Sequence, residues 1–126
     1  MAKQTILLIE DDDSMVSLLQ TLLEIEGYRA ERLPGKIDME VILAWVSNEK
    51  PDLVLLDVNL RQLNGLDLIR RVRQDEQLKG LPVLMTSGME LSKECLQAGA
   101  NGFILKPFMP DELIGKIRGL LPAAGL

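Results

Sequence analysis

The sequence predicts an α/β fold in which a parallel β-sheet carries helices on both faces. Short, uninterrupted apolar runs of strand length recur along the chain, and strands buried on both faces have this pattern. Segments with apolar residues at helical spacing alternate with these runs, and glycine or proline separates the two kinds of segment. Such alternation favours parallel strands joined by right-handed crossovers. We therefore expect one α/β domain over residues 1–121, followed at 122–126 by a C-terminal tail or the start of a linker.

Five strands are expected. Four are apolar runs, and the other is charged and loosely alternating, which suits an edge strand closed by Pro34-Gly35. The fourth strand is expected to lead into a turn formed by Thr86-Ser87-Gly88. The expected ranges are 6–9, 28–33, 53–56, 82–85 and 103–105.

Five helices are expected between and after these strands. The first has apolar residues at helical spacing from Met15, an N-cap at Asp12 or Asp13, and Gly27 as its stop signal. The next two cover residues 39–46 and the segment after Gly65. A short helix at 91–97 and a glycine-weakened one at 111–121 complete the set.

The composition excludes several classes of function. The net charge of −5 leaves no basic stripe for the phosphates of nucleic acid. The cluster Arg70, Arg71 and Arg73 is interpreted as a solvated helix face, the usual fate of such a run. The absence of histidine excludes histidine-type zinc sites, Ser-His-Asp triads and histidine general bases.

The single cysteine, Cys95, cannot form an internal disulfide and is expected to be a small buried residue. Every apolar run is far shorter than the ~20 residues of a membrane span. We therefore expect no membrane association and a cytoplasmic location.

Polar side chains that can bind a ligand or take part in a reaction follow four of the five predicted strands. Ligands of open parallel sheets bind at the carboxyl ends of the strands. Two like charges about 5 Å apart repel by roughly 3 kcal/mol at an effective dielectric constant near 20, so clustered acids favour a bound cation. An all-oxygen site with few ligands suits Mg²⁺, and an aspartate nucleophile beside such an ion suits phosphoryl transfer. The residues at these strand ends are Glu10, Asp11, Asp57, Ser87 and Lys106.

Each of these residues also has an ordinary structural explanation. Asp12 and Asp13 are interpreted as helix caps, a strand-end aspartate often caps the next loop, and a lysine before proline is often only solvated. Their joint placement at separate strand ends is what favours a site.

In these motifs the chain resembles the receiver domain of bacterial two-component response regulators, from Thr5 to Leu121. The resemblance is carried by the Glu10-Asp11 pair and, in order, by LVLLDVNL, NGLDLIRRVR, PVLMTSG and AGANGFILKPF. It implies a flavodoxin-like sheet with strand order 2-1-3-4-5. It also implies a signalling switch rather than a conventional enzyme, one that assists its own phosphorylation and dephosphorylation.

The resemblance implies a role for each site residue. Asp57 would accept a phosphoryl group from a phosphohistidine on a sensor histidine kinase or a histidine phosphotransfer protein. Mg²⁺ would be held by Asp11 directly, by Glu10 through water, by Asp57, and by the main-chain carbonyl of Asn59. Lys106 would pair with the phosphoryl group, and the bond before Pro107 would be cis.

The resemblance also implies a switch. Ser87 would move to a phosphoryl oxygen and Phe103 would turn inward with it, remodelling the face formed by the fourth helix, the fifth strand and the fifth helix. An output partner or domain, whose identity is unknown, would read that face, and phosphorylation could drive homodimer formation.

The chain departs from the family pattern at several positions. Arg61 stands where a proline is common, Ser87 where threonine is commoner, and Phe103 where tyrosine is frequent. The stretch from Ser87 to Lys106 is a few residues short, which shortens the fourth helix. Met109 replaces a frequent helix-capping serine, so the last helix is expected to start without that cap.

Two alternatives stay open on the sequence. One is a receiver-like interaction module that is never phosphorylated. The other, less favoured, is a Mg²⁺-dependent phosphohydrolase with an aspartyl nucleophile, similar to the haloacid-dehalogenase group through Asp57-Val58-Asn59. That group places its nucleophile after the first strand, whereas Asp57 follows the third predicted strand.

Overall fold

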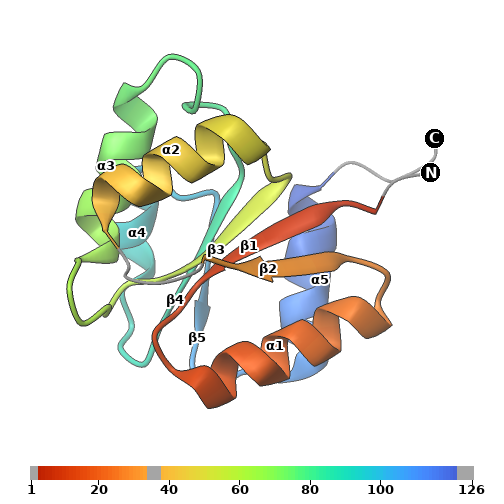
Figure 1. Cartoon of the computed structure of the whole chain (residues 1–126). Coiled ribbons are helices and arrows are strands. Elements are labelled where there is room, and N and C mark those ends of the chain that lie inside the picture. Colours follow the sequence, from red (N-terminus) through yellow and green to blue (C-terminus); the bar gives the residue numbers. More distant parts are fainter. Residues whose placement is uncertain (1–2, 34–37, 122–126) are drawn as a thin grey trace.

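Ten alternating strands and helices build the chain in the computed structural model, which describes residues 3–33 and 38–121 (Figure 1). The strands are β1 (Thr5–Ile9), β2 (Arg29–Arg32), β3 (Leu53–Asp57), β4 (Val83–Ser87) and β5 (Gly102–Leu105). The helices are α1 (Asp13–Ile25), α2 (Met39–Glu49), α3 (Gly65–Gln74), α4 (Ser92–Ala98) and α5 (Pro110–Leu120). Each expected element is present.

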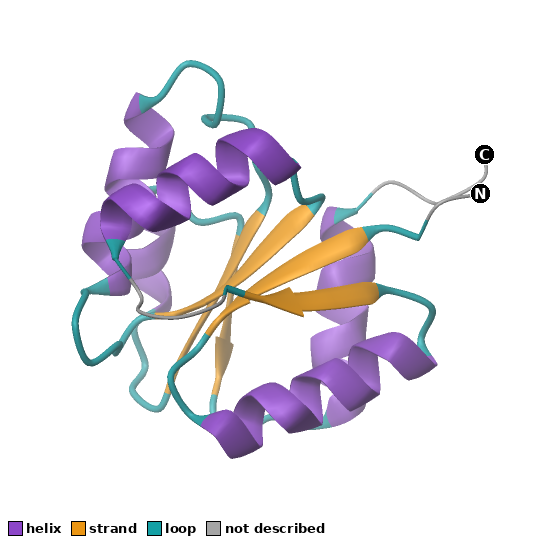
Figure 2. Ribbon diagram, in the orientation of Figure 1, coloured by secondary structure: helices purple, strands orange, loops and turns teal. Residues whose placement is uncertain are grey.

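The five strands form one parallel sheet in the order β2-β1-β3-β4-β5, which confirms the predicted fold class and strand order. Figure 2 shows the twisted strands between two layers of helices. Helices α2, α3 and α4 cover one face, and α1 and α5 cover the other (Figure 1). The parallel order brings the carboxyl ends of β1, β3 and β4 side by side at one edge of the sheet.

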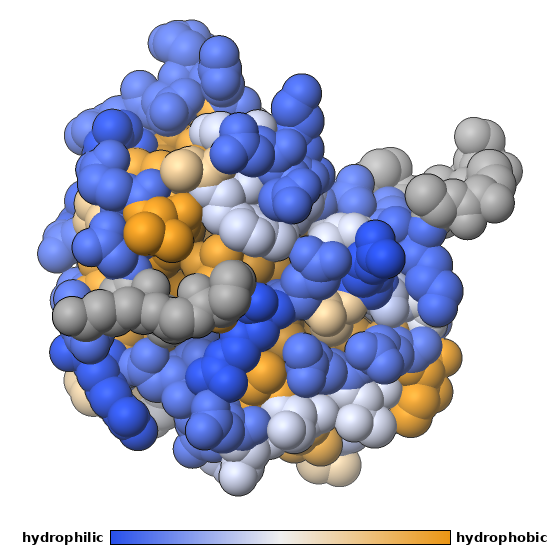
Figure 3. Space-filling model, viewed as in Figure 1, coloured by the Kyte–Doolittle hydropathy of each residue, from blue (hydrophilic) through white to orange (hydrophobic). Residues whose placement is uncertain are grey.

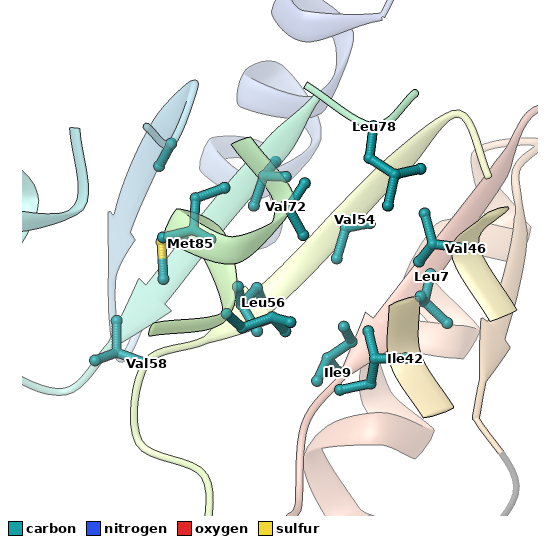
Figure 4. Packing of buried hydrophobic residues seen from close by; sticks show 14 of the residues in the cluster. Leu7, Ile9, Ile42, Val46, Val54, Leu56, Val58, Val72, Leu78 and Met85 are labelled. Carbon is teal, nitrogen blue, oxygen red and sulfur yellow. The ribbon is translucent and has the colours of Figure 1, made fainter. Parts of the chain in front are cut away.

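Successive residues of each strand supply the two halves of the core, because side chains alternate between the faces of a sheet. Leu7 and Ile9 of β1 pack toward α2 and α3, and Figure 4 shows them facing Ile42 and Val46 of α2. Ile6 and Leu8 instead join the cluster beneath α1 and α5. The central strands β3 and β4 are buried along their whole length, as continuous apolar runs predict.

The fourth strand continues further than its apolar run predicts. We expected Thr86 and Ser87 in a turn, but β4 extends through both, and they pair with Ile104 and Leu105 of β5. Main-chain pairing sets the end of a strand, so polar side chains do not stop it while a partner strand remains. The Pro34-Gly35 turn and the predicted tail at 122–126 lie outside the described residues.

Side chains cap three of the helices. Asp12, not Asp13, is the N-cap of α1 and accepts a hydrogen bond from the Met15 N–H at 2.9 Å. Asp38 and Asn64 cap α2 and α3 in the same way. Met109 occupies the N-cap of α5 without a side-chain hydrogen bond, in agreement with the expected missing cap.

The interpretation of Arg73 as part of a solvated helix face is wrong. Its guanidinium donates to the carbonyl oxygens of Gly99 at 2.8 Å, Lys79 at 3.0 Å and Leu81 at 2.8 Å, and to Asn101 Oδ1 at 2.8 Å. Arg73 thus ties α3 to the segment that precedes β4 and to the segment between α4 and β5. Arg70 is exposed, as expected.

The fourth helix is short, as the sequence predicts, with seven residues from Ser92 to Ala98. It ends at Gly99, whose φ of 118° lies in the left-handed region that favours glycine. Cys95 is fully buried beneath this helix, and burial raises the pKa of its thiol to about 11.

The face displayed in Figure 3 is mostly hydrophilic, with an apolar area beside α2 and further apolar side chains over α1. Two of the exposed large apolar residues, Leu18 and Ile25, belong to that helix. Across residues 3–33 and 38–121, no helix combines the length and hydropathy needed to cross a bilayer.

Candidate functional site

The carboxyl edge of the sheet gathers the predicted site residues. Asp57 is the last residue of β3 and Ser87 the last of β4, whereas Glu10 and Lys106 follow β1 and β5 directly. The sheet order places β3 between β1 and β4, so Asp57 lies at the centre of the edge. The apolar runs that bury these strands therefore also carry polar groups to a common point.

Lys106 contacts two carboxylates at this point. Its ammonium nitrogen lies 2.7 Å from Glu10 Oε1 and 3.4 Å from Asp57 Oδ2. The side chains of Glu10 and Asp57 are only 7% and 9% exposed, and that of Lys106 is 21% exposed. Buried charges are found where they are paired and hydrogen-bonded, and this trio meets that condition.

The buried trio changes the acidity of its members. Desolvation and the negative charge of Glu10 raise the pKa of Asp57 above its ordinary value, and Lys106 and the Asn59 N–H only partly oppose them. Burial alone would lower the pKa of Lys106, but the hydrogen bond to Glu10 and the charge of Asp57 outweigh it, so this pKa is raised. The site thus holds more negative charge than its single ammonium group neutralises.

Ser87 and Asn59 form the next contact along the edge. Asn59 Nδ2 donates to Ser87 Oγ at 3.3 Å, and the Met89 N–H donates to the same oxygen at 3.1 Å. The Asn59 N–H also donates to Asp57 Oδ1 at 3.3 Å. Ser87 is fully buried. Its hydroxyl oxygen is therefore occupied, while no acceptor for its hydrogen is found among the described residues.

Asp11 follows Glu10 in the loop after β1, and its described side-chain contact is with a different loop. Its Oδ2 accepts a hydrogen bond from the main-chain N–H of Arg61, in the segment between β3 and α3. Arg32, at the end of β2, flanks the same loop. Its guanidinium forms a 2.7 Å ion pair with Asp13 and donates to the carbonyl oxygens of Glu10 and Asp11, each at 3.4 Å.

A cleft of about 410 Å³ opens between the loop that follows β1 and the loop that follows β3. One wall is the acidic run that follows β1, and Arg32 and Arg61 approach it from the neighbouring segments. The lining residues are Leu8, Ile9, Glu10, Asp11, Asp12, Asp13, Ser14, Arg32, Leu33, Arg61 and Gln62.

The donor set fits a divalent cation in its chemistry. Glu10, Asp11 and Asp57 supply carboxylate oxygens and Asn59 a main-chain carbonyl, which are the ligands that Mg²⁺ prefers. Burial first and the charge of Glu10 second raise the pKa of Asp57, and a bound cation would oppose both effects. Within residues 3–33 and 38–121, no three acidic or cysteine side chains are already gathered around one point as metal ligands. In this arrangement Lys106 and the Arg61 N–H hold Glu10 and Asp11 instead.

Two further predicted residues lie next to this edge. Phe103, in β5, is buried in the core cluster that also contains Met85 and Cys95. The peptide bond between Lys106 and Pro107 is cis.

Sequence reasoning missed two residues that shape the site. The β1–β2 register pairs Leu8 with Arg32, so an arginine at the end of the edge strand reaches the acidic loop beside it. Gly65 packs on the end of β3, where an added Cβ would lie 2.5 Å from the Asp57 carbonyl oxygen. The position of Arg32 could have been inferred from the expected strand at 28–33 beside the first strand, but no sequence signal reveals the close approach at Gly65.

The sequence pattern that defines the response regulator receiver domain matches residues 6–118. The phosphate regulon transcriptional regulatory protein PhoB of Pseudomonas aeruginosa is 31% identical over 99% of this chain, which covers 55% of PhoB. The DNA-binding response regulator MtrA of Mycolicibacterium smegmatis is 34% identical over 94% of the chain and is covered over 51% of its length. The chain thus spans about half the length of these relatives.

Solved structures agree in fold. A response regulator from Chloroflexus aurantiacus superposes with a TM-score of 0.86 at 32% identity, covering 94% of this chain and 98% of that one. The receiver domain of the sensor histidine kinase PA1611 from Pseudomonas aeruginosa gives a TM-score of 0.81 at 28% identity, with 94% and 98% coverage. That receiver domain has a magnesium ion coordinated in its active site cleft.

Proposed function

The chain belongs to the response regulator receiver family of two-component systems, and on this premise we propose that it is a phosphorylation switch in which Asp57 accepts a phosphoryl group with Mg²⁺ as cofactor. The contact of Lys106 with both Glu10 and Asp57 carries the proposal, because it assembles a nucleophile, a second acid and a cation in a buried site. Phosphoryl transfer needs mainly positioning and charge neutralisation, and these groups supply both.

The donor is a phosphohistidine on a sensor histidine kinase or a histidine phosphotransfer protein. These 126 residues contain no histidine, so the phosphohistidine lies outside them. A carboxylate oxygen of Asp57 attacks the phosphorus, the P–N bond breaks, and its electron pair returns to the imidazole. The product is an acyl phosphate on Asp57. Attack of water on its phosphorus later returns the carboxylate and releases inorganic phosphate.

Each neighbouring residue has a part in this transfer. Lys106 neutralises the phosphoryl oxygens, and the Ser87 hydroxyl hydrogen is donated to one of them. Bound Mg²⁺ would supply Lewis-acid charge neutralisation, held by Asp57 and Asp11 directly, by Glu10 through water, and by the Asn59 carbonyl. The donation by Ser87 requires its movement, because the side chain is buried.

The readout surface is the face formed by α4, β5 and α5. Movement of Ser87 and Phe103 biases this face between two arrangements, which a partner distinguishes. Four large apolar side chains are exposed on or beside it: Met89, Leu96, Leu105 and Met109. An output domain, a separate output protein or a second copy of the chain would bind there. The net charge of −5 argues against direct binding of nucleic acid by this domain.

A receiver-like interaction module without phosphorylation remains the alternative. The observation in its favour is that Glu10 and Asp11 already bond Lys106 and the Arg61 N–H. The phosphohydrolase is disfavoured because Asp57 is the last residue of β3, whereas that group places its nucleophile after the first strand.

The test is the intact mass of the protein after incubation with acetyl phosphate and Mg²⁺. We expect uptake of one phosphoryl group in the wild type, and none in Asp57→Asn or after metal chelation. Phosphoryl uptake that persists in Asp57→Asn would contradict the assignment of Asp57 as the acceptor. If the wild type takes up no phosphoryl group and also fails to bind beryllofluoride, the interaction module becomes the better account.

A further inference from the structure

The main-chain hydrogen bond between Arg61 and Asp11 joins two loops that are 50 residues apart in sequence. Asp11 follows β1, and Arg61 lies four positions after Asp57, in the segment that leads to α3. The Arg61 side chain is exposed, whereas its N–H points at the half-buried Asp11 carboxylate. The contact thus depends on the backbone of residue 61 and not on its guanidinium.

We propose that the Arg61 N–H is a positioning group that fixes the Asp11 carboxylate for Mg²⁺. The proposal rests on the proposed function, which assigns Asp11 to the metal. A carboxylate has two oxygens with several lone pairs, so Oδ2 can accept this bond while Oδ1 remains for a cation. Hydrogen-bond partners of metal ligands orient those ligands, and their loss typically costs about 10–100-fold in metal affinity.

The other acids of the site already have partners that hold them. Glu10 bonds Lys106 at 2.7 Å and accepts from the Asp12 N–H at 3.2 Å. Asp57 lies between Lys106 and the Asn59 N–H. For the Asp11 side chain, the Arg61 N–H is the one hydrogen-bond partner found among the described residues. This hydrogen bond is therefore the described contact that orients the Asp11 carboxylate.

Arg32 fixes the main chain of the same loop from the opposite side. Its bonds to the carbonyl oxygens of Glu10 and Asp11, with its ion pair to Asp13, hold the backbone against the end of β2. Because the backbone is held independently, the Arg61 N–H acts on the orientation of the Asp11 side chain alone. Its removal should therefore change metal affinity without unfolding the loop.

A pair of substitutions isolates the backbone donor. Arg61→Ala removes the guanidinium and keeps the N–H, whereas Arg61→Pro removes both, because proline has no N–H. Any effect of the lost positive charge is common to the two variants and cancels in their comparison. We expect Arg61→Pro to bind Mg²⁺ about tenfold more weakly than Arg61→Ala by titration calorimetry. Equal or tighter binding by Arg61→Pro would overturn the proposal.

Phosphorylation kinetics separate positioning from general damage. With acetyl phosphate as donor, Arg61→Pro should need about tenfold more Mg²⁺ than Arg61→Ala for half-maximal rate, and the two rates should converge at saturating Mg²⁺. A lower rate that Mg²⁺ does not restore would indicate a distorted site and would contradict the proposed role.

The amide resonance of Arg61 in the wild type gives a second measurement, which does not need the proline substitution. We expect a low-field amide proton that moves toward the random-coil position in Asp11→Ala and stays low-field when Mg²⁺ is added. Loss of the low-field shift on Mg²⁺ addition would show that the metal breaks the bond, and the proposal would fall. If the wild type bound no Mg²⁺, the proposed function would fail as well, whereas equal affinities of the two Arg61 variants would overturn only this inference.

Discussion

The ammonium group of Lys106 and the carboxylate of Glu10 form a 2.7 Å ion pair that joins the end of β5 to the end of β1. Two strands, β3 and β4, separate β1 from β5 in the sheet, so the pair reaches across the carboxyl edge and over Asp57. The ion pair between Lys106 and Asp57 is longer, at 3.4 Å. Burial raises the pKa of Asp57 most, the negative charge of Glu10 raises it further, and Lys106 opposes both.

Glu10→Gln should lower the pKa of Asp57. The substitution removes the negative charge that raises this pKa and frees Lys106 to approach Asp57. A carboxyl-detected NMR titration in metal-free buffer measures the shift, with Glu24→Gln, at an exposed position on α1, as the control. An unchanged or higher Asp57 pKa in Glu10→Gln would contradict this electrostatic description.

Asp57→Asn should stabilise the metal-free protein at pH 7. A folded-state pKa above the unfolded value means that folding favours the protonated carboxyl, so stability is lost as pH rises from the unfolded pKa of about 3.8 through the folded pKa. Asparagine is neutral at every pH, so the variant does not lose stability in this way. Denaturant unfolding at pH 7 and at pH 3 measures the effect, and the advantage of Asp57→Asn should shrink at pH 3. A less stable Asp57→Asn at pH 7 would mean that Lys106 outweighs desolvation.

Gly65→Ala should destabilise the fold by about 1–3 kcal/mol, the usual cost of overpacking. The new Cβ would lie 2.5 Å from the Asp57 carbonyl oxygen and 2.9 Å from Val58 Cα, which are backbone atoms with little freedom to move. Gly115→Ala is the matched control, because nothing lies within 4 Å of its added Cβ on the exposed side of α5. That control should gain about 0.5–1 kcal/mol from helix propensity. Equal unfolding free energies for the two variants would refute the close packing at Gly65.

Arg73→Ala should destabilise the fold by about 2 kcal/mol or more, because it removes four hydrogen bonds and leaves partly buried carbonyl oxygens without their donor. Arg70→Ala, on the exposed side of the same helix, should cost about 0.5 kcal/mol or less, because it loses only a surface pair with Asp67. Denaturant unfolding of both variants gives the comparison. If Arg73→Ala destabilises the fold no more than Arg70→Ala does, Arg73 behaves as a solvated surface residue and this account of its hydrogen bonds is wrong.

Local patterns in the sequence predicted much of this structure. The continuous apolar runs of β1, β3 and β4 identify buried strands, and their polar ends place Asp57 and Glu10 at one edge. The contacts of Arg73 and Arg61 were not predictable in the same way. Arg73 lies four positions after the buried Ile69, beside the apolar stripe of α3, but its charge alone indicated a surface residue. Its partners come from segments that only the tertiary fold brings near. Arg61 acts through its main chain, on which the identity of the side chain gives no information.

The chemical identity of the phosphorylated residue tests the central claim most directly. Borohydride reduces an acyl phosphate to an alcohol and would convert phosphorylated Asp57 into homoserine, which tandem mass spectrometry locates by residue. After treatment with acetyl phosphate and Mg²⁺, followed by reduction, we predict homoserine at position 57 and nowhere else, with none in a sample prepared without metal. Homoserine at Asp11 or Asp12, or a phosphoryl group that withstands borohydride, would contradict the assignment of Asp57 as the acceptor.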